Sequence, residues 1–239
     1  MKKMKMLIGD CYMYGASVRG RKHIKENMPN QDAFSLYRDD DLIVMTVADG
    51  LGSKPKSDAG AEKVCKVVPE CVKAWKRSGN TSVKSLVSMI ADRWQDGMDH
   101  INDYAATCLL SILDKEGITL VQVGDGMVYG IIDNQEVLLE EKTDEDFTNI
   151  TSSIASADLD DWKIKQYRIT EKSCFAIVLS TDGVSEDLLS AKRKDFTEYL
   201  VAQLDSNEDK SAMLNSMLED WGGKYSLDDK TLAILYRHG

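Results

Sequence analysis

The stretch from Val44 to Gly52, VMTVADGLG, joins an apolar run to an abrupt acidic end. The run contains two β-branched valines and predicts a buried strand that ends at Asp49. A carboxylate at the end of a buried strand is costly unless a partner neutralises it, and glycine lets the backbone approach that partner closely. Taken alone, the stretch is better explained by an ordinary turn, since Asp-Gly is a common turn dipeptide.

The same arrangement recurs along the whole chain. Five positions place a carboxylate at or beside the end of an apolar strand: Asp32, Asp49, Asp125, Asp182 and the pair Asp228-Asp229. Strand ends meet at one rim of a sheet structure, where clustered carboxylates repel one another unless cations neutralise them. Ligand sets made only of oxygen atoms favour hard cations such as Mg²⁺ or Mn²⁺. The repeated pattern therefore predicts a metal site.

Composition argues against two classes of partner. The chain of 239 residues carries 40 acidic and 30 basic residues, a formal net charge of −10. An acidic protein is a poor match for the phosphate backbone of nucleic acids or for an anionic membrane surface. No stretch is long and apolar enough for a membrane span. We therefore expect no nucleic-acid partner and no membrane association.

The cysteines and histidines limit the available chemistry. Five cysteines, an odd number without CxxC spacing, are typical of a reduced intracellular protein. The basic start of the chain is followed by too short an apolar run for a signal peptide, so a cytoplasmic location is expected. The three histidines are His23, His100 and His238, too few in suitable places for a zinc site or a serine-histidine-aspartate triad.

Hydrophobic periodicity predicts the order of the elements. Strands are expected at residues 11–18, 34–37, 42–48, 105–113, 118–123, 127–132, 136–139, 164–169, 174–180 and 231–236, with the four between 105 and 139 forming one meander. Helices are expected at 57–75, where Pro69 should kink or end the helix, at 81–102, at 192–204 and at 207–221, with a short one starting at Ser185. Residues 19–29 and 140–161 are expected to be loops.

This order predicts an α+β fold. Two successive helices between antiparallel runs suggest two sheets stacked face to face, with helices on the outside. No linker or internal repeat divides the sequence, so residues 1–239 are expected to form a single domain. A chain of this length buries roughly 70–75% of its extended surface and needs no disulfides to fold.

With these motifs in place, the chain resembles the metal-dependent serine/threonine protein phosphatase 2C family, in its bacterial form. The motifs follow the family's order: Asn30-Gln31-Asp32-Ala33, Ala48-Asp49-Gly50-Leu51-Gly52, Ser57-Asp58-Ala59-Gly60-Ala61, the Thr107 strand at 105–110, Gly124-Asp125-Gly126, Ser180-Thr181-Asp182-Gly183 and Asp228-Asp229-Lys230-Thr231. Each motif is weak alone, and the match at Gly124-Asp125-Gly126 is partial. Together, and in the family's order, the motifs are a specific sign of the resemblance.

The resemblance implies an α-β-β-α sandwich with two Mg²⁺ or Mn²⁺ ions in the cleft between the sheets. It assigns Asp49 to bridge both ions, Asp182 and Asp228 to hold the first, and the carbonyl of Gly50 to hold the second. Asp125, together with Asp182, would hold a third and weaker ion. Ions placed in this way fix a shared water, lower its pKa and aim it at phosphorus, so that no covalent phosphoenzyme is needed.

Two positions, Gln31 and Leu51, depart from the family pattern. Gln31 and Asp32, in the N-x-D-A motif, complete the expected metal site, but many relatives carry glutamate at the position of Gln31. A neutral amide still accepts a hydrogen bond or ligates weakly. Some relatives carry histidine as a general acid where this chain has Leu51. Protonation of the leaving group would then come from metal-bound water or be unassisted.

The phosphate ligand is the least determined position. Many relatives place an arginine a few residues before the N-x-D-A motif, and that spacing gives Asn27 here. The same loop carries basic side chains at Arg19, Arg21, His23 and Lys25. His23 is assigned to the catalytic set as a phosphate ligand, with Arg21 as the alternative. A solvated basic loop explains the segment equally well.

These inferences together predict a Mg²⁺- or Mn²⁺-dependent phosphatase acting on phosphoserine and phosphothreonine in proteins. Asp49, Asp182 and Asp228 form its expected catalytic core. The expected partners are a phosphoprotein substrate and a kinase or other signalling protein, and a monomer is expected. One alternative is a catalytically weak or inactive regulatory module of the same fold. Another is a hydrolase of small phosphate esters.

Overall fold

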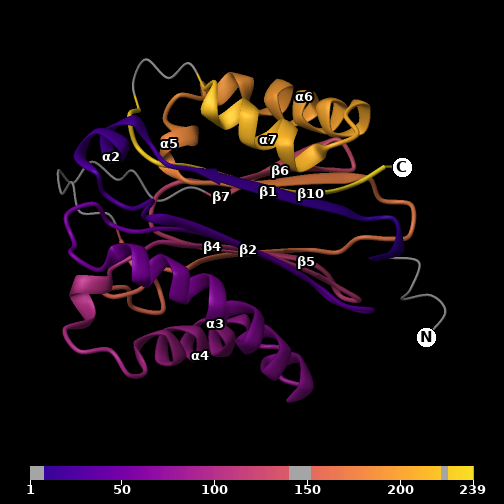
Figure 1. Cartoon of the computed structure of the whole chain (residues 1–239). Helices are drawn as coiled ribbons and strands as arrows, with labels where there is room; N and C mark the ends of the chain where they lie inside the picture. The colour runs from indigo at the N-terminus through magenta and orange to yellow at the C-terminus, as the bar shows by residue number, and fades with distance from the viewer. Residues whose placement is uncertain (1–7, 140–151, 222–225, 239) are drawn as a thin grey trace.

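Two antiparallel sheets are stacked face to face at the centre of the protein (Figure 1). The computed structural model describes residues 8–139, 152–221 and 226–238. The first sheet contains, in spatial order, β1 (Tyr12–Val18), β10 (Lys230–Arg237), β9 (Phe175–Ser180), β6 (Met127–Ile132) and β7 (Gln135–Leu139). The second sheet contains β2 (Asp32–Arg38), β3 (Ile43–Asp49), β4 (Cys108–Asp114), β5 (Gly117–Val123) and β8 (Lys163–Tyr167).

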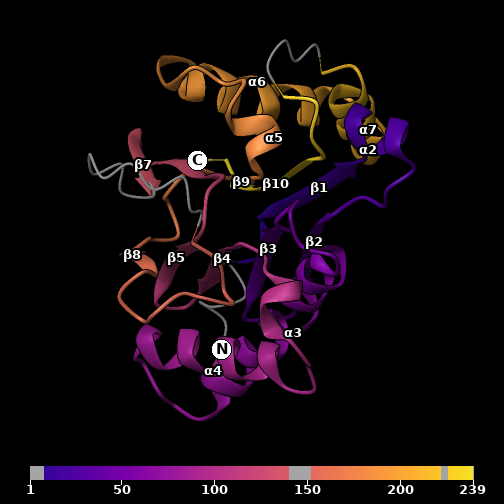
Figure 2. The ribbon, with the colours of Figure 1, turned by 90° about the vertical axis from the view of Figure 1, so that its left-hand side faces the viewer.

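Helices cover the outer face of each sheet, so that the fold has four layers. Figure 2 shows these layers from one end of the sandwich. The second sheet is covered by α3 (Ser57–Arg77) and α4 (Val83–Gln95), and the first sheet by α6 (Arg193–Ser206) and α7 (Lys210–Glu219). The α-β-β-α sandwich predicted from the sequence is therefore confirmed. None of the described helices is both long and apolar enough to cross a membrane.

Strand β3 is buried on both of its faces, which explains its unbroken apolar sequence. Ile43, Met45 and Val47 belong to the core between the two sheets. Val44 and Ala48 point the other way and belong to the core between the second sheet and helices α3 and α4. Burial of an aliphatic side chain of this size contributes about 1.5–3 kcal/mol. Packing on both faces therefore holds the end of β3 firmly in place.

The prediction that the four strands between residues 105 and 139 form one meander is wrong in one respect, because these strands are divided between the two sheets. β4 pairs with β5 in the second sheet, whereas β6 pairs with β7 and β9 in the first. The chain crosses from one sheet to the other at Gly124-Asp125-Gly126, where both glycines have positive φ values, 89° and 92°. A side chain at either glycine position would be strained in this conformation. The crossing places Asp125 between the sheets.

Of the two effects expected of Pro69, a kink or an early end of the helix, the early end is wrong, because α3 continues from Ser57 to Arg77. Proline removes one backbone hydrogen bond from a helix. Here Pro69 is buried on the packed face of α3, next to Val68 and near Val72. We attribute the continuity of the helix to this packing, which stabilises the turn despite the lost hydrogen bond.

Several boundaries differ from the expectation. The basic segment expected as a loop contains a short helix, α2 (Arg21–Glu26), which Asn27 ends in the left-handed conformation. Helix α4 ends at Gln95, shortly before Gly97, whose φ is 73°. Helix α5 (Asp182–Ser185) starts earlier than expected and takes Asp182 into its first turn.

The long loop expected at 140–161 lies partly outside the described residues. Its described part, 152–161, contains no helix or strand. This part is attached to the segment that leads into β4, because the backbone N–H of Ile154 donates a 2.9 Å hydrogen bond to the carbonyl of Ala106. The side chain of Ile154 is buried in the core beneath α3 and α4.

Candidate metal centre

Acidic side chains from four separate segments meet at one end of the sandwich. Asp49 ends β3, Asp125 lies where the chain crosses between the sheets, Asp182 opens α5 directly after β9, and Asp228 precedes β10. Together they line a cavity of about 130 Å³, whose other lining residues are Gln31, Gly50, Leu51, Gly52 and Thr107. The structure thus brings these four carboxylates together at one cavity.

The backbone of Asp49 and Gly50 is held by the residues that directly precede the two neighbouring strands, β4 and β2. The N–H of Asp49 donates to Thr107 Oγ1 at 2.9 Å, and its carbonyl accepts from the N–H of Thr107 at 2.8 Å. The next N–H, of Gly50, donates to the carbonyl of Gln31 at 3.0 Å. A Cβ atom on Gly50 would lie only 2.5 Å from the carbonyl oxygen of Ser57. Only glycine therefore allows α3 to begin this close to the cavity.

Asp32 lies behind the cavity and connects three strands. It pairs with Asp49 in the register of β2 and β3. Its Oδ2 accepts a 2.8 Å hydrogen bond from Thr181 Oγ1, which in turn accepts from the N–H of Thr231 at 3.0 Å. Burial, together with the nearby charges of Asp229 and Asp182, raises the pKa of Asp32 to about 8.

The carboxylates at the cavity oppose one another's ionisation. Burial is the largest cause that raises the pKa of Asp49 well above its usual value, followed by the charges of Asp32 and Asp182. The pKa of Asp182 is also raised by burial, although a hydrogen bond with Asp49 acts in the opposite direction. A bound cation would relieve this repulsion, because it interacts more favourably with the ionised carboxylates than with the protonated ones.

The raised pKa of Asp32 predicts a pH-dependent stability of the metal-free protein. Between the usual carboxyl pKa of 3.8 and about 8, the folded protein holds a proton on Asp32 that the unfolded chain has released. Stability falls with rising pH wherever the folded state binds more protons. We expect the free energy of unfolding to fall by about 1–3 kcal/mol between about pH 6 and pH 8, measured by urea denaturation in the presence of a chelator.

Asp32→Asn should reduce this slope, because the amide does not titrate, and Asp49 and Asp182, whose pKa values are also raised, account for the part that remains. The exposed Asp40, in the turn between β2 and β3, provides a matched control. Asp40→Asn should keep the slope of the wild-type protein. An unchanged slope in Asp32→Asn would show that Asp32 is not the group that takes up the proton.

A second buried cluster lies directly behind Asp228. Asp229 accepts hydrogen bonds from the N–H groups of Gly20 and Gln31, both at 2.6 Å, and contacts His23 Nδ1 at 2.8 Å. His23 and Asp229 are each only 2% exposed, and His23 Nε2 lies 4.0 Å from Asp228 Oδ1. A carboxylate only accepts hydrogen bonds, so we assign the proton of this contact to Nδ1.

The ligand atoms of His23, Asp228 and Asp229 lie within 4.8 Å of one another, which is close enough to share an ion. Both oxygens of Asp229, however, already accept the three hydrogen bonds described above. This cluster therefore supports the wall of the cavity. Sequence reasoning did not single out Asp229 as a site residue. The signal was present in the Asp228-Asp229 pair, but the sequence does not show which of the two faces inward.

The residues predicted from the sequence fall into three groups. The cavity is lined by Asp49, Gly50, Asp125, Asp182, Asp228 and Gln31. Asp32 and His23 are buried behind it. Arg21 is exposed on α2. His23 as the structure places it has little surface for a phosphate group, whereas Arg21 is open to solvent.

The donor set at the cavity fits a hard divalent cation. Its side-chain donors are four carboxylates, one amide and one hydroxyl, all of them oxygen ligands, which Mg²⁺ and Mn²⁺ prefer. Gln31 supplies a further observation, since its buried Oε1 has no hydrogen-bond partner among the described residues. A buried acceptor without a partner is costly, and a cation or its bound water would satisfy it. The residues therefore fit the metal that the resemblance implies.

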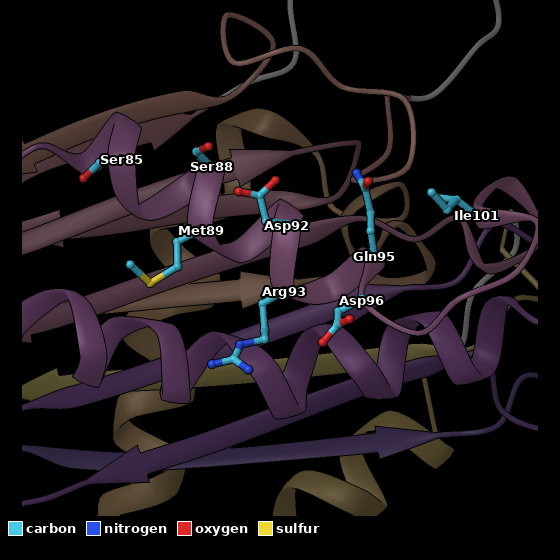
Figure 3. Close-up of a pocket in the computed structure, with 8 residues that line it drawn as sticks. All are labelled: Ser85, Ser88, Met89, Asp92, Arg93, Gln95, Asp96 and Ile101. Atoms are coloured by element: carbon cyan, nitrogen blue, oxygen red, sulfur yellow. The ribbon is translucent and has the colours of Figure 1, made fainter.

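A larger hollow, of about 730 Å³, lies on the outer face of α4 (Figure 3). Seven of the eight side chains drawn come from α4 and the residue after it, and the eighth is Ile101. Asp92, Arg93 and Asp96 are exposed there. None of the predicted site residues lines this hollow, so its size does not make it a candidate for the chemistry.

Solved structures share this fold over nearly the whole chain. The photosystem II phosphatase PBCP matches with a TM-score of 0.67 at 13% identity, covering 95% of this chain and 99% of that one. The S. agalactiae serine/threonine phosphatase matches with 0.64 at 17%, covering 95% and 100%. RsbX, solved in complex with magnesium, matches with 0.59 at 15%, covering 95% and 96%. At these identities the likeness shows the fold alone, that of a class of phosphatases.

The family follows from the sequence itself. The family model described as protein phosphatase 2C matches residues 19–221, which is most of the chain. The chain therefore belongs to the protein phosphatase 2C family, and the resemblance drawn from the motifs is confirmed. No curated protein matches the chain by sequence.

Proposed function

We propose that this protein is a Mg²⁺- or Mn²⁺-dependent phosphatase that hydrolyses phosphoserine and phosphothreonine in protein substrates. Membership of the family supports protein phosphatase activity in general. The observation that carries the finer proposal is the convergence of Asp49, Asp125, Asp182 and Asp228 on one cavity, next to the unpartnered Oε1 of Gln31. A phosphoprotein is the substrate partner in this proposal.

In this proposal Asp49 would contact two ions, Asp182 and Asp228 would hold one of them, and the Gly50 carbonyl with Gln31 the other. Asp125 would add a weaker third position. Bound Mg²⁺ or Mn²⁺ supplies an acidified water as nucleophile and neutralises charge on the phosphoryl oxygens. RsbX, which shares this fold and was solved in complex with magnesium, supports the choice of a hard divalent ion.

The surrounding residues hold these ligands in place. Thr107 fixes the backbone of Asp49 at the end of β3. Thr181 connects Asp32 to the start of α5, next to Asp182. Leu51 lines the cavity where some relatives carry histidine, and its side chain has no proton to donate. Substrates with good leaving groups, such as aryl phosphates, should therefore react faster than alkyl phosphates.

We further propose that Asp229 and His23 position Asp228. Asp229→Asn is then expected to weaken Mn²⁺ binding by about 10–100-fold, the usual cost of changing a group that orients a metal ligand. The substitution keeps the side-chain volume but removes the negative charge that holds His23 beside Asp228. Calorimetric titration of metal-free protein measures the affinity, and a thermal melt reports whether the variant is folded.

A matched control for this variant is Asp114→Asn. Asp114 is also a buried carboxylate, paired with Lys76 at the far end of β4. Its substitution should lower stability without changing the affinity for Mn²⁺.

The activity that Asp229→Asn loses through weaker Mn²⁺ binding should largely return at saturating Mn²⁺, where kcat should be close to that of the wild-type protein. A folded Asp229→Asn protein with wild-type affinity would contradict the positioning role.

The proposed function is tested by phosphate release from three classes of substrate. The wild-type protein with Mn²⁺ should act on a phosphoserine peptide and on phenyl phosphate, and only poorly on free phosphoserine. Activity confined to small esters would identify a hydrolase of small phosphate esters. Absence of activity on all three, in a protein that binds Mn²⁺, would identify a regulatory module that retains its metal site.

A further inference from the structure

Helix α2 lies at the same end of the molecule as the carboxylate cavity. In Figure 1 it is found at the end of the sandwich where α5 also begins. Two contacts place it beside Asp228: the N–H of Lys22 donates to the carbonyl of Leu227 at 3.1 Å, and His23 lies against Asp228 and Asp229. The single buried residue of α2 is His23. Because these contacts hold α2 against Asp228, the helix lies beside a residue that lines the cavity.

The outer surface of α2 is basic in a protein that is otherwise acidic. Arg21, Lys22 and Lys25 are exposed on the helix, where Glu26 is the one acidic residue. Lys22 and Lys25 are three positions apart and lie on one face. Two large apolar side chains are also exposed here, Ile24 on the helix and Leu227 beside it, each at 55%. We call this surface the α2 surface: Arg21, Lys22, Ile24, Lys25 and Leu227.

The charge of the α2 surface complements that of the proposed substrate. Among the described residues that line the cavity there is neither lysine nor arginine. A phosphorylated segment is negatively charged, and so is the protein as a whole, with a net charge of −10. At physiological salt, charges act over about 8 Å, so cations adjoining the cavity influence an approaching substrate most. Complementary charges at the rim of a binding site raise association rates and select partners.

From this arrangement we infer that the α2 surface binds acidic residues that flank the phosphorylated serine or threonine of a protein substrate. This inference rests on the proposed function and adds to it a preference for substrates with acidic residues near the phosphorylated one. Lys22 and Lys25 pair with aspartate or glutamate of the substrate, while Ile24 and Leu227 offer an apolar surface to a neighbouring side chain. Without the α2 surface, the net charge of the protein would make an acidic substrate the poorer one.

Two phosphoserine peptides test the inference, one flanked by glutamates and one by alanines, with phenyl phosphate as a substrate that has no flanks. The wild-type protein should prefer the acidic peptide by about tenfold in kcat/KM, mostly through KM, and the preference should shrink at high salt. The double variant Lys22→Glu, Lys25→Glu should lose this preference and turn over phenyl phosphate at the wild-type rate.

The control reverses two charges at the opposite end of the first sheet. Arg168 and Lys172 are exposed between β8 and β9, and β9 separates them from Asp182 by about 20 Å. Arg168→Glu with Lys172→Glu changes the net charge equally and should keep the preference for the acidic peptide.

The possible outcomes distinguish a failure of the proposed function from a failure of the proposed role of the α2 surface. A wild-type protein without activity on any of the three substrates contradicts the proposed function itself. Activity on all three without a preference for the acidic peptide overturns only the role of the α2 surface. An equal loss in the control variant also overturns it, because net charge alone then explains the effect. Loss of phenyl phosphate turnover in the α2 variant would overturn it as well, because the helix would then act on the catalytic centre.

Discussion

Asp49→Asn is expected to abolish tight ion binding and to lower kcat/KM by at least about 10³-fold. Asp49 is the carboxylate that the proposal places between two ions, so its loss affects both ion positions. Its backbone is held by Thr107, and an amide of the same size should leave that geometry unchanged. Phenyl phosphate hydrolysis measures the rate, and calorimetry with Mn²⁺ measures the binding.

The same substitution should leave the metal-free fold intact or stabilise it. The pKa of Asp49 is raised by burial and by the neighbouring carboxylates, so its ionised form is disfavoured in the folded state near neutral pH. A melt in chelator should therefore give a Tm no lower than that of the wild-type protein. The exposed Asp40→Asn should change neither rate nor Tm. A Tm of Asp49→Asn in chelator well below that of the wild-type protein would identify Asp49 as a structural residue.

Asp125→Asn is expected to lower turnover by about one to two orders of magnitude while keeping two tightly bound ions. Asp125 lines the cavity, and its charge acts on Asp49. The proposal gives it only the third and weaker ion, so the main pair should remain. Raising the Mn²⁺ concentration should recover part of the lost activity. Calorimetric stoichiometry and a Mn²⁺ titration of the rate measure these two effects.

A turn aspartate provides the control for Asp125. Asp133, in the hairpin between β6 and β7, accepts a 3.0 Å hydrogen bond from the N–H of Cys174, and an asparagine oxygen can accept the same bond. Asp133→Asn should therefore be silent. Gly124 and Gly126 carry the unusual backbone conformation of the crossing, so Asp125→Asn should also keep the wild-type Tm. Full activity of Asp125→Asn at low Mn²⁺ would leave Asp125 as a connecting residue only.

Much of the fold could be predicted because buried positions give the sequence a regular pattern of apolar residues. β3 reads as a continuous apolar run because both of its faces are packed. The division of the meander could not be predicted in this way. A hairpin and a crossing between sheets can both use a glycine-rich turn, and only long-range pairing decides between them. α2 was missed because a single buried side chain, His23, gives a six-residue helix no periodicity to detect.

The candidate site likewise contains residues that the neighbouring sequence predicts and residues that only contacts between distant segments reveal. Asp49, Asp182 and Asp228 could be proposed because each follows or precedes an apolar strand. The supporting cluster could not, because Asp229 acts through Gly20, His23 and Gln31, which lie about two hundred positions away in the chain. Period-two alternation predicts that one member of the Asp228-Asp229 pair faces inward. It does not predict which one, or what that residue meets there.

The most direct measurement is phosphate release from a phosphoserine peptide by chelator-treated protein, with and without added Mn²⁺. The account predicts no release in chelator, full release after Mn²⁺ is restored, and no recovery in Asp49→Asn at the same Mn²⁺ concentration. Equal release by the wild-type protein in chelator and in Mn²⁺, matched by Asp49→Asn, would contradict a metal-dependent phosphatase centred on these carboxylates.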